Sequence, residues 1–273
     1  MQLKVGFVGG GNMSTAIVQG ICKNEIRDSL NIWVSGPHKE NLEHWKQYGA
    51  NVTTSNGEVI CNCDIVFIGV KPAMLDNALC NCYLPTKDPK NILFISMLAG
   101  VNIQKLKQVL KQLPFNSNVI RIFPNTPMSV GAGSCLYAID ENVTLEQCAV
   151  LEKLLAGCGL CEKVSEPLMD SLGILTGCGP AFMYMIIEAL ADGAVKQGVP
   201  RAMALRHSAQ MMAGSATMVL QSNKHPGQLK DEVCSPGGCT IAGVTALENG
   251  KLRATMINAI EAATLRVKEM SKN

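Results

Sequence analysis

The first 164 residues alternate short β-branched runs with amphipathic segments of helical spacing. This alternation is typical of βα units, which build a parallel sheet covered by helices. We expect strands at residues 4–8, 31–35, 51–54, 65–70, 92–96 and 119–123, with further strands at 134–139 and 161–164. We expect helices at residues 13–23, 39–48, 73–82, 103–110 and within 140–157. The predicted fold of this part is a doubly wound, Rossmann-like sheet.

The pattern changes after about Glu166, where strand patterns disappear. Ala, Met, Leu and Gly recur at helical spacing through residues 181–197, 202–221 and 252–270. We therefore predict an NAD(P)-binding α/β domain over residues 1–164 and an all-α domain over 165–273. The second domain is strongly apolar for its size, which favours a homodimer held together by its helices. The alternative is that these apolar faces are all covered within one monomer.

Composition excludes several classes of partner. The net charge is only +2, aromatic residues make up 4%, and no basic run is interleaved with aromatics, so a nucleic-acid surface is not expected. The chain begins MQLKVGFVGG without a basic leader, and a cytoplasmic protein is expected. The most apolar stretch, 181–187, is followed by Glu188 and Asp192, so no membrane segment is predicted.

The chain has twelve cysteines but only four histidines. Cys61 and Cys63, Cys80 and Cys82, and Cys158 and Cys161 form close pairs, yet no second pair completes a zinc-like set of four ligands. We expect free thiols and no metal.

A glycine-rich turn follows the first expected strand. Gly9 and Gly11 allow a tight turn and close approach of the backbone to a pyrophosphate, which binds at the positive end of the following helix. Ser14 stands where a third glycine is usual and is small enough for close packing. The second strand ends with Ser35 and lacks the Asp or Glu of an NAD-selective site, while His38 and Lys39 follow it. NADPH is therefore the favoured cofactor and NADH the alternative, with His38 and Lys39 either contacting its phosphate or facing solvent.

Other strand ends complete the predicted cofactor site at the carboxyl edge of the sheet. The predicted cofactor-binding residues are Gly9, Gly10, Gly11, Asn12, Met13, Ser35, Asn56, Gly69, Val70, Lys71, Pro72, Leu98, Ala99 and Gly100. Two prolines fix the turn around Asn125 and Thr126 and direct both toward the same edge or into a structural cap. The Gly177–Ala181 stretch is expected to end one helix and begin the next, with Pro180 early in the new one.

These motifs together resemble one enzyme family. They are GFVGGGNM at residues 6–13, GVKP at 69–72, PNTP at 124–127, GCGPA at 177–181 and, most specific of all, HPGQLKDEVCSPGGCTI at 225–241. Over essentially its whole length the chain resembles pyrroline-5-carboxylate reductase. The resemblance implies reduction of 1-pyrroline-5-carboxylate to L-proline with NAD(P)H, an interlocked helical dimer, and often a decamer of five dimers. It also implies that the SPGG block binds the substrate.

Residue chemistry gives that block specific roles. The turn at Pro236, Gly237 and Gly238 exposes backbone N–H groups just before a helix expected at about 240–247, which makes a nest for a carboxylate. Ser235 adds a hydroxyl donor, and the main chain at Cys239 and Thr240 completes the cradle. We predict that the Thr240 hydroxyl is the catalytic group, a relay or orienter at the imine nitrogen, because it is too weak an acid to be the final proton source.

Glu166 matches a family position near the substrate ring and is predicted to orient it, or else is an exposed loop carboxylate. Three residues depart from the family pattern: Cys178 stands where Ser is common, Cys239 where Thr or Ala is usual, and Glu232 adds a carboxylate near the cofactor phosphates. The Lys and Asn that a β-hydroxyacid dehydrogenase needs are missing from residues 179–198, apart from Lys196 at the far end. An NADP-sensing regulatory protein with a vestigial reductase site is the remaining alternative.

Overall fold

The computed structural model describes residues 2–23, 25–80, 82–86 and 90–270. The chain forms two compact units, Met1–Gly177 with Arg266–Asn273, and Cys178–Leu265. The α/β unit is the first of these and the helical unit the second. The domain boundary after residue 164 stays a prediction; it lies just before the long helix α6, whereas the compact units divide within that helix.

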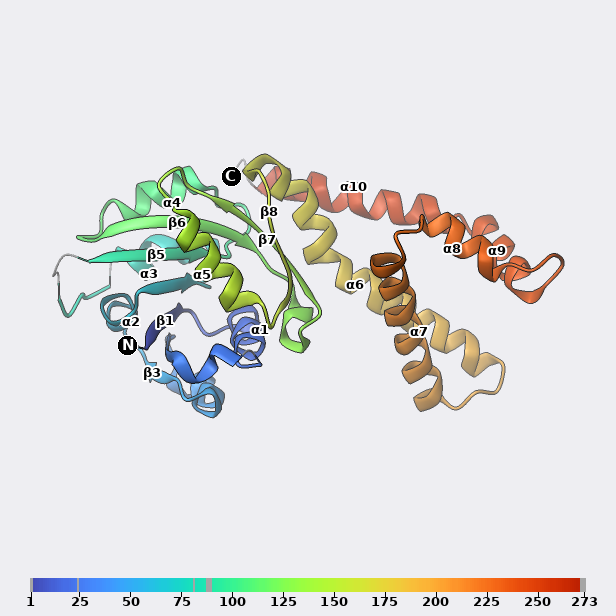
Figure 1. Cartoon of the computed structure of the whole chain (residues 1–273), viewed down its shortest axis with the longest axis horizontal. Coiled ribbons are helices and arrows are strands. Elements are labelled where there is room, and N and C mark those ends of the chain that lie inside the picture. Colours follow the sequence, from blue (N-terminus) through green and yellow to red (C-terminus); the bar gives the residue numbers. More distant parts are fainter. Residues whose placement is uncertain (1, 24, 81, 87–89, 271–273) are drawn as a thin grey trace. The chain divides into compact units, whose positions relative to one another are not determined.

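The α/β unit is built on one eight-stranded sheet of order β3-β2-β1-β4-β5-β6-β7-β8 (Figure 1). Its strands are β1 Leu3–Val8, β2 Leu30–Ser35, β3 Asn51–Thr53, β4 Ile65–Ile68, β5 Asn91–Ser96, β6 Asn116–Phe123, β7 Gly133–Ile139 and β8 Gly159–Lys163. All neighbouring strands are parallel except β6 and β7, which are antiparallel. Because a parallel sheet collects the carboxyl ends of its strands at one edge, the loops after β1, β2, β4 and β5 lie at that edge.

The helices of the chain alternate with these strands and then continue alone. They are α1 Asn12–Ile21, α2 Asn56–Asn62, α3 Leu75–Leu79, α4 Ile103–Leu110, α5 Leu145–Leu155, α6 Glu166–Lys196, α7 Arg201–Ser222, α8 Pro226–Val233, α9 Cys239–Asn249 and α10 Leu252–Met270. Short 3-10 segments are η1 Glu25–Ser29, η2 Lys39–Tyr48, η3 Pro72–Met74 and η4 Thr126–Val130. The predicted fold class is confirmed, while the segment 39–48 is a 3-10 helix and α2 was not predicted.

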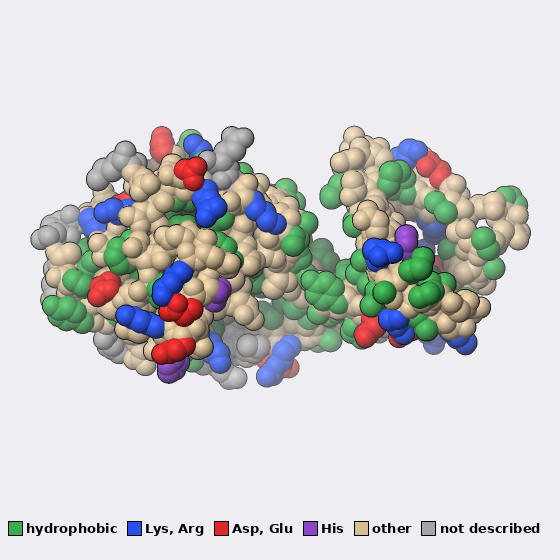
Figure 2. All heavy atoms as spheres, turned by 90° about the horizontal axis from the view of Figure 1, so that it is seen from below, with side chains coloured by type: hydrophobic (Ala, Val, Ile, Leu, Met, Phe, Trp, Pro, Cys, Tyr) green, Lys and Arg blue, Asp and Glu red, His purple; other side chains and the backbone are tan. Residues whose placement is uncertain are grey.

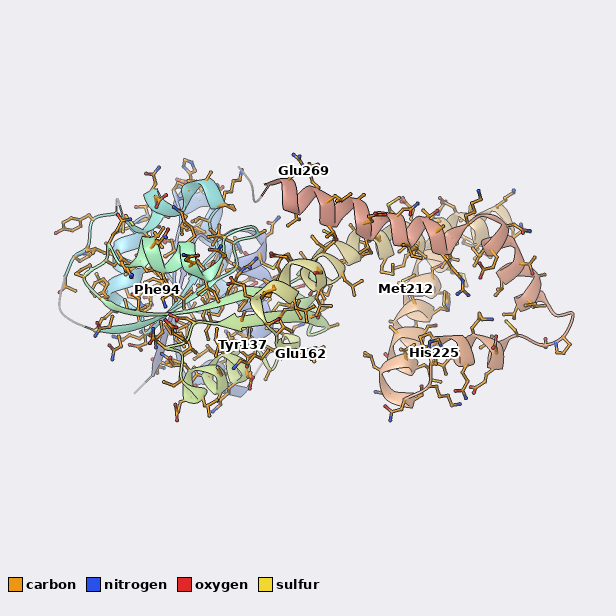
Figure 3. The ribbon with its side chains drawn as sticks, turned by 90° about the horizontal axis from the view of Figure 1, so that it is seen from above. Phe94, Tyr137, Glu162, Met212, His225 and Glu269 are labelled. Atoms are coloured by element: carbon orange, nitrogen blue, oxygen red, sulfur yellow. The ribbon has the colours of Figure 1, made fainter. Side chains whose placement is uncertain are left out.

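Two apolar layers, one on each face, hold the sheet unit together. Phe7, Trp45 and Phe67 lie in the layer that also contains α1 and α5 side chains, and Phe7 stacks on Phe67 with ring centroids 4.8 Å apart. Phe94 belongs to the opposite layer, with side chains of α2, α3 and α4 (Figure 3). Both faces of the central strands are therefore buried, as expected for a parallel sheet.

The expected helix break at residues 177–181 is wrong. Helix α6 runs without interruption from Glu166 to Lys196, with Pro180 inside it. Proline lacks the N–H that would bond the carbonyl four residues earlier, which is that of Thr176. The Asn125 side chain donates to this carbonyl oxygen over 3.0 Å and therefore replaces the missing helical bond. This contact allows the helix to continue where local sequence rules predict a stop.

The helical unit buries almost none of its apolar side chains within one chain. Within residues 178–265, all of which the structure describes, only Ala191 and Ala204 are buried hydrophobics. Hydrophobic side chains lie exposed over its surface (Figure 2). By length and composition α6 could also cross a bilayer, and the helix is only 11% buried over that window. The same composition is found in a helix that packs against another subunit.

Candidate active site

The turn between β1 and α1 has the geometry of an anion cradle. Gly9 has φ +98°, a conformation that side-chain-bearing residues rarely adopt, and its N–H donates to the Ser35 carbonyl over 3.0 Å. The Ser14 hydroxyl donates to the Gly9 carbonyl over 2.5 Å and fixes the other side of the turn. The turn is thus held between the ends of β1 and β2.

The N-terminus of α1 is open for a ligand. Its N-cap is Gly11, which makes no side-chain cap, and no acidic residue lies in the first turn of this described helix. Space around Gly11 is free to at least 4 Å from a hypothetical Cβ. The first N–H groups of a helix have no partner within it and favour an anion, so Gly10, Gly11, Asn12 and Met13 fit a pyrophosphate.

Ser35 and Asn56 contact each other inside the protein. The Ser35 side chain is fully buried, and its hydroxyl donates to Asn56 Oδ1 over 2.7 Å. Asn56 Nδ2 in turn donates to the Ala78 carbonyl over 3.0 Å. The Ser35 hydroxyl therefore supports the strand end from within, while His38 and Lys39 are the exposed polar side chains that follow it.

The ends of β4 and β5 bring the remaining predicted cofactor residues to the same edge. The Gly69 N–H donates to the Val8 carbonyl over 2.9 Å, and the Met97 N–H donates to the Ile68 carbonyl over 3.2 Å. After these bonds, Lys71 and Pro72 are exposed, and so are Ala99 and Gly100, whereas Leu98 is buried. The segment that follows β4 consists of Gly69, Val70 and Lys71. The segment that follows β5 contains Leu98, Ala99 and Gly100.

Glu166 is already engaged in an ion pair with the buried Arg121. Its Oε1 accepts from the Ile103 N–H over 2.8 Å and from Arg121 Nη1 over 3.2 Å, while Arg121 Nη2 contacts Asp170 Oδ1 over 2.9 Å. Arg121 is 2% exposed. Sequence reasoning missed this residue, although an arginine within the apolar strand NVIRIF is a signal for a buried partner. A substrate contact for Glu166 stays a prediction.

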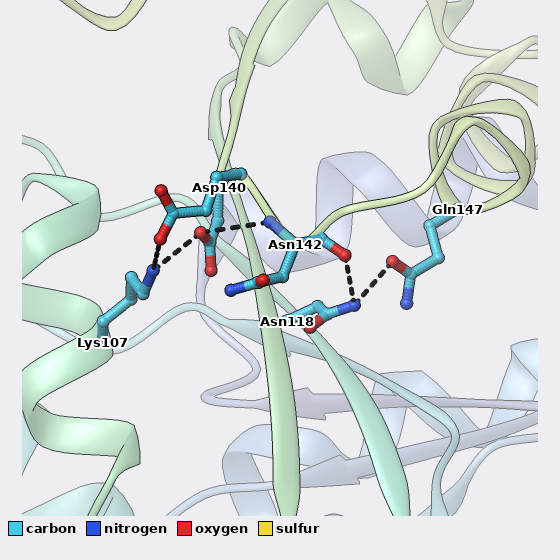
Figure 4. Close-up of polar contacts among 6 residues, drawn as sticks. Lys107, Asn118, Asp140, Asn142 and Gln147 are labelled. Carbon is cyan, nitrogen blue, oxygen red and sulfur yellow. Dashed lines mark hydrogen bonds and ion pairs between the residues drawn. The ribbon is translucent and has the colours of Figure 1, made fainter.

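A cavity of about 440 Å³ adjoins Glu166 on the outer side of α4. Three of its charged side chains contact one another: Lys107 Nζ contacts Asp140 Oδ1 over 2.8 Å and Glu141 Oε1 over 3.1 Å (Figure 4). Asn118 Nδ2 donates to the Asn142 carbonyl over 3.0 Å and so joins β6 to the same loop. This network ties α4 to the end of β7 and has no direct link to the glycine turn.

Asn125 and Thr126 lie differently from each other. Asn125 is buried, and its Oδ1 accepts from the Ser134 N–H over 2.9 Å in addition to the bond that it donates to Thr176. Both ends of its amide are therefore used structurally, as the cap alternative predicted. Thr126 is exposed at the start of η4.

The predicted substrate block forms the turn between α8 and α9 in the helical unit. Gly237 has φ +67°, and the Gly238 N–H donates to the Ser235 carbonyl over 3.1 Å. Gly238 is the N-cap residue of α9, and within this turn, which the structure describes throughout, no side chain caps the first N–H groups of the helix. Thr240 lies half-buried in the first turn of the helix, beside the exposed Cys239. The structure thus brings Ser235, Gly237, Gly238, Cys239 and Thr240 together around one free helix N-terminus.

Glu232 does not carry an unpaired charge. Lys224 Nζ contacts both of its carboxylate oxygens at 2.9 Å, and Gln228 donates to it over 3.1 Å. The hydrogen bond from Lys224 is the main reason that the pKa of Glu232 is lowered. The repulsion expected from this carboxylate toward phosphates is therefore offset within α8 and the loop before it.

Two family models match the chain. Residues 166–270 match "Pyrroline-5-carboxylate reductase dimerisation", and residues 4–100 match "NADP oxidoreductase coenzyme F420-dependent". The first match covers the exposed apolar helices and confirms that the chain forms oligomers. The second covers the glycine turn and strands β1 to β5, and it confirms the predicted NAD(P)H cofactor.

Relatives match along nearly the whole chain. Pyrroline-5-carboxylate reductase 3 of Macaca fascicularis is 40% identical over 98% of this chain and 96% of its own length. Among solved structures, pyrroline carboxylate reductase of Plasmodium falciparum with NADP bound has a TM-score of 0.82 at 32% identity and 98% coverage of both chains. The Streptococcus pyogenes 1-pyrroline-5-carboxylate reductase has a TM-score of 0.84 at 30% identity, with 98% of this chain and 99% of that one covered. Since a relative that is 40% identical matches nearly the whole of this chain, the chain belongs to the pyrroline-5-carboxylate reductase family of oxidoreductases.

Proposed function

We propose that this protein reduces the imine of 1-pyrroline-5-carboxylate to L-proline with NADPH, as the final reaction of proline biosynthesis. The observation that carries the proposal is the turn at residues 235–240, where a positive-φ glycine and an uncapped α9 present free N–H groups beside a threonine hydroxyl. A vestigial, cofactor-sensing protein would have no need of this second anion site.

The N-terminus of α9 binds the substrate carboxylate. Its first N–H groups, from Cys239 onward, have no partner within the helix, and the helix dipole favours a negative charge there. The Ser235 hydroxyl adds one more donor at the same turn. Nothing lies within 4 Å of a Cβ built at Gly237, so the carboxylate can approach the turn there, whereas Gly238 leaves the space that Ser235 Oγ occupies.

Thr240 acts on the ring nitrogen. Its hydroxyl lies in the same helical turn as the N–H groups that hold the carboxylate, so one bound molecule can reach both. When hydride adds to the imine carbon, electron density moves to nitrogen, and a hydrogen bond to that nitrogen stabilises the change. Thr240 orients or relays the proton, while water or the protonated iminium supplies it.

In the α/β unit, residues 9–13 hold the cofactor's pyrophosphate and residues 69–72 and 98–100 flank the rest of it. Bound NADPH supplies the hydride. We infer a preference for NADPH over NADH because no acidic side chain ends β2 and the exposed His38 and Lys39 follow it. Lys39→Glu should lower the ratio of kcat/KM for NADPH to that for NADH by about three- to tenfold, since a charged hydrogen bond contributes about 1.5–3 kcal/mol before solvent screening.

Ser35→Asp is the less informative variant for cofactor choice. It would place a carboxylate in a fully buried position against Asn56 Oδ1, so a loss of stability would accompany any change in cofactor preference. An unchanged cofactor ratio in Lys39→Glu would contradict the role of this segment.

The assembly and location of the protein extend the proposal. Five dimers forming a decamer is the arrangement that the family resemblance implies, and the apolar helical unit supports at least the dimer. A cytoplasmic location is also part of the proposal. Sedimentation of the purified protein tests the first of these, and fractionation of cells tests the second.

The decisive experiment follows the absorbance of NADPH with and without 1-pyrroline-5-carboxylate. Wild-type protein should oxidise NADPH only when the substrate is present, and Thr240→Ala should lower kcat by about 100-fold while NADPH binding is kept. Thr245→Ala is the matched control, because this exposed threonine of the same helix bonds back to the Ile241 carbonyl over 2.9 Å. Cofactor binding without substrate-dependent oxidation would favour the regulatory alternative.

A further inference from the structure

Two cysteines face each other across the last two strands of the sheet. Cys135 of β7 and Cys161 of β8 are direct register partners in a parallel pair, so their side chains point to the same face. Adjacent strands lie roughly 4.8 Å apart, which is within the roughly 4.4–6.8 Å Cα separation that a disulfide spans. The Cys135 thiol donates to the Leu136 carbonyl over 3.7 Å, and each of the two cysteines shifts the pKa of the other. The reductase chemistry uses neither residue.

The two thiols differ in exposure. Cys135 is 1% exposed, whereas Cys161 lies half-buried on β8, which is the last strand at this edge of the sheet. Tyr137 and Glu162 lie on the same two strands (Figure 3). A small reagent can therefore reach Cys161 from the strand edge, whereas Cys135 is shielded from solvent.

The local environment favours a thiolate at Cys161. The hydrogen bond from Cys135 is the main cause that lowers the pKa of Cys161, against burial and the Glu152 carboxylate, which raise it. Burial has the opposite result at other cysteines and raises the pKa of Cys63 and of Cys158 to about 12. Burial also raises the pKa of the half-buried Cys22. Since the thiolate is the reactive form, Cys161 stands apart from these thiols.

Metal binding does not account for the cluster. Cys158 lies near the pair, but its Sγ contacts the Ile17 carbonyl of α1 at 3.8 Å. In the portion of the chain that the structure covers, no three His, Cys, Asp or Glu side chains are arranged to hold a metal ion. A pair of adjacent thiols, one reachable and one buried, has instead the arrangement of an attacking and a resolving cysteine.

We propose that Cys161 and Cys135 form a thiol oxidation site that reacts with a small peroxide and closes into a disulfide between β7 and β8. In the first step the Cys161 thiolate attacks one oxygen of hydrogen peroxide; an S–O bond forms, the O–O bond breaks, and the departing hydroxide takes a proton to become water. In the second step the Cys135 sulfur attacks the Cys161 sulfenic acid. The S–S bond forms, the S–O bond breaks, and the hydroxide leaves as a second water with the Cys135 proton. Two thiols lose two electrons, and one peroxide becomes two waters.

The test maps oxidised thiols on the full-length protein. The reduced protein is treated with one equivalent of hydrogen peroxide, its free thiols are blocked with N-ethylmaleimide, and peptides are identified by mass spectrometry. The expected result is a linked pair of peptides containing Cys135 and Cys161, with two of the twelve thiols lost and both recovered with dithiothreitol. Linkage of Cys161 to Cys158, or first oxidation of the exposed Cys239, would overturn the proposal.

Three variants keep the test independent of folding defects. Cys161→Ser, at a half-buried position, should abolish the cross-link, and Cys22→Ser, also half-buried, should leave it unchanged. Cys135→Ala should convert the product into a Cys161 sulfenic acid that dimedone traps. If Cys135→Ala unfolds the protein, the first two variants still decide the matter, because a cross-link in Cys161→Ser or none in Cys22→Ser contradicts the assignment.

Discussion

The two units of this chain reach their structure in different ways. In the α/β unit, strand and helix side chains such as Phe7, Trp45 and Phe94 are fully buried within one chain. In the helical unit, side chains of similar character, such as Met185 and Leu220, are 69% and 80% exposed. The first unit is stable through its own core, whereas the second needs a surface from outside the chain to cover its apolar side chains.

This difference also divides the functional residues. The predicted cofactor residues lie mainly on strand-end loops fixed by bonds such as that from the Gly9 N–H to the Ser35 carbonyl. The turn at residues 235–240, which we propose binds the substrate, lies on the unit that matches the dimerisation model. We therefore expect cofactor binding to survive changes that remove substrate turnover, and the predictions below use this contrast.

The largest effect is expected from a charge on the apolar helical surface. Met211→Glu in α7, where the methionine is 51% exposed, should weaken dimer association at least about 100-fold, because it removes apolar burial and buries a carboxylate. Analytical ultracentrifugation measures the change. Gln210→Glu adds the same charge beside it and should have the smaller effect. A dimer unaffected by Met211→Glu would show that this face is not the interface.

Sequence alone predicted most of the α/β unit for physical reasons. Periodicity and glycine turns are local signals, and they located the strands and the residue 9–13 cradle. Helix α2 was missed although Ser55, which accepts from the Glu58 N–H over 3.3 Å, and Glu58 are spaced as in an N-terminal capping box. The antiparallel pairing of β7 with β6 depends on contacts between distant residues, which periodicity does not report.

The second prediction concerns the part-buried ion pair between Arg121 and Glu166 at the start of α6. Glu166→Gln should lower the free energy of unfolding by about 1.5–3 kcal/mol through loss of a charged hydrogen bond to Arg121. Asp170→Asn, at a 51% exposed carboxylate, should cost less. Chemical denaturation measures both. A rise in KM for 1-pyrroline-5-carboxylate in Glu166→Gln but not in Asp170→Asn would support the predicted substrate role; equal kinetics would make Glu166 purely structural.

The candidate site shows why sequence placed some residues better than others. The roles of Gly237 and Gly238 follow from backbone geometry, which their residue types reveal directly. Ser35 and Glu166 have side chains whose partners, Asn56 and Arg121, lie 21 and 45 residues away along the chain. A single sequence cannot show such pairings, so these two side chains were expected at the ligand before their internal partners were known.

A third, smaller effect is expected where the α/β unit supports α6. Asn125→Ala should lower the free energy of unfolding by about 1–2 kcal/mol or more, because the Thr176 carbonyl then loses its donor and the Ser134 N–H its acceptor. Pro180→Ala restores a backbone N–H for that carbonyl, so the double variant should lose less than the sum of the two single effects. A double-mutant cycle from urea denaturation measures this coupling. Strict additivity would mean that Asn125 does not compensate for the proline.

The smallest effect is expected for the exposed ion pair between Lys224 and Glu232 of the helical unit, in contrast to the part-buried pair between Arg121 and Glu166 of the α/β unit. Lys224 lowers the pKa of Glu232 in the folded protein, so the pair stabilises the fold above the unfolded pKa, near 4.5. This contribution is lost as the pH falls through the lower folded pKa. Lys224→Gln should therefore reduce the Tm slightly at neutral pH, and this reduction should disappear as the pH falls through the lowered folded pKa of Glu232. In a Glu232→Gln background, the Tm change caused by Lys224→Gln should not depend on pH, because the titrating carboxylate is gone. If the pH dependence persisted, it would arise from another carboxylate.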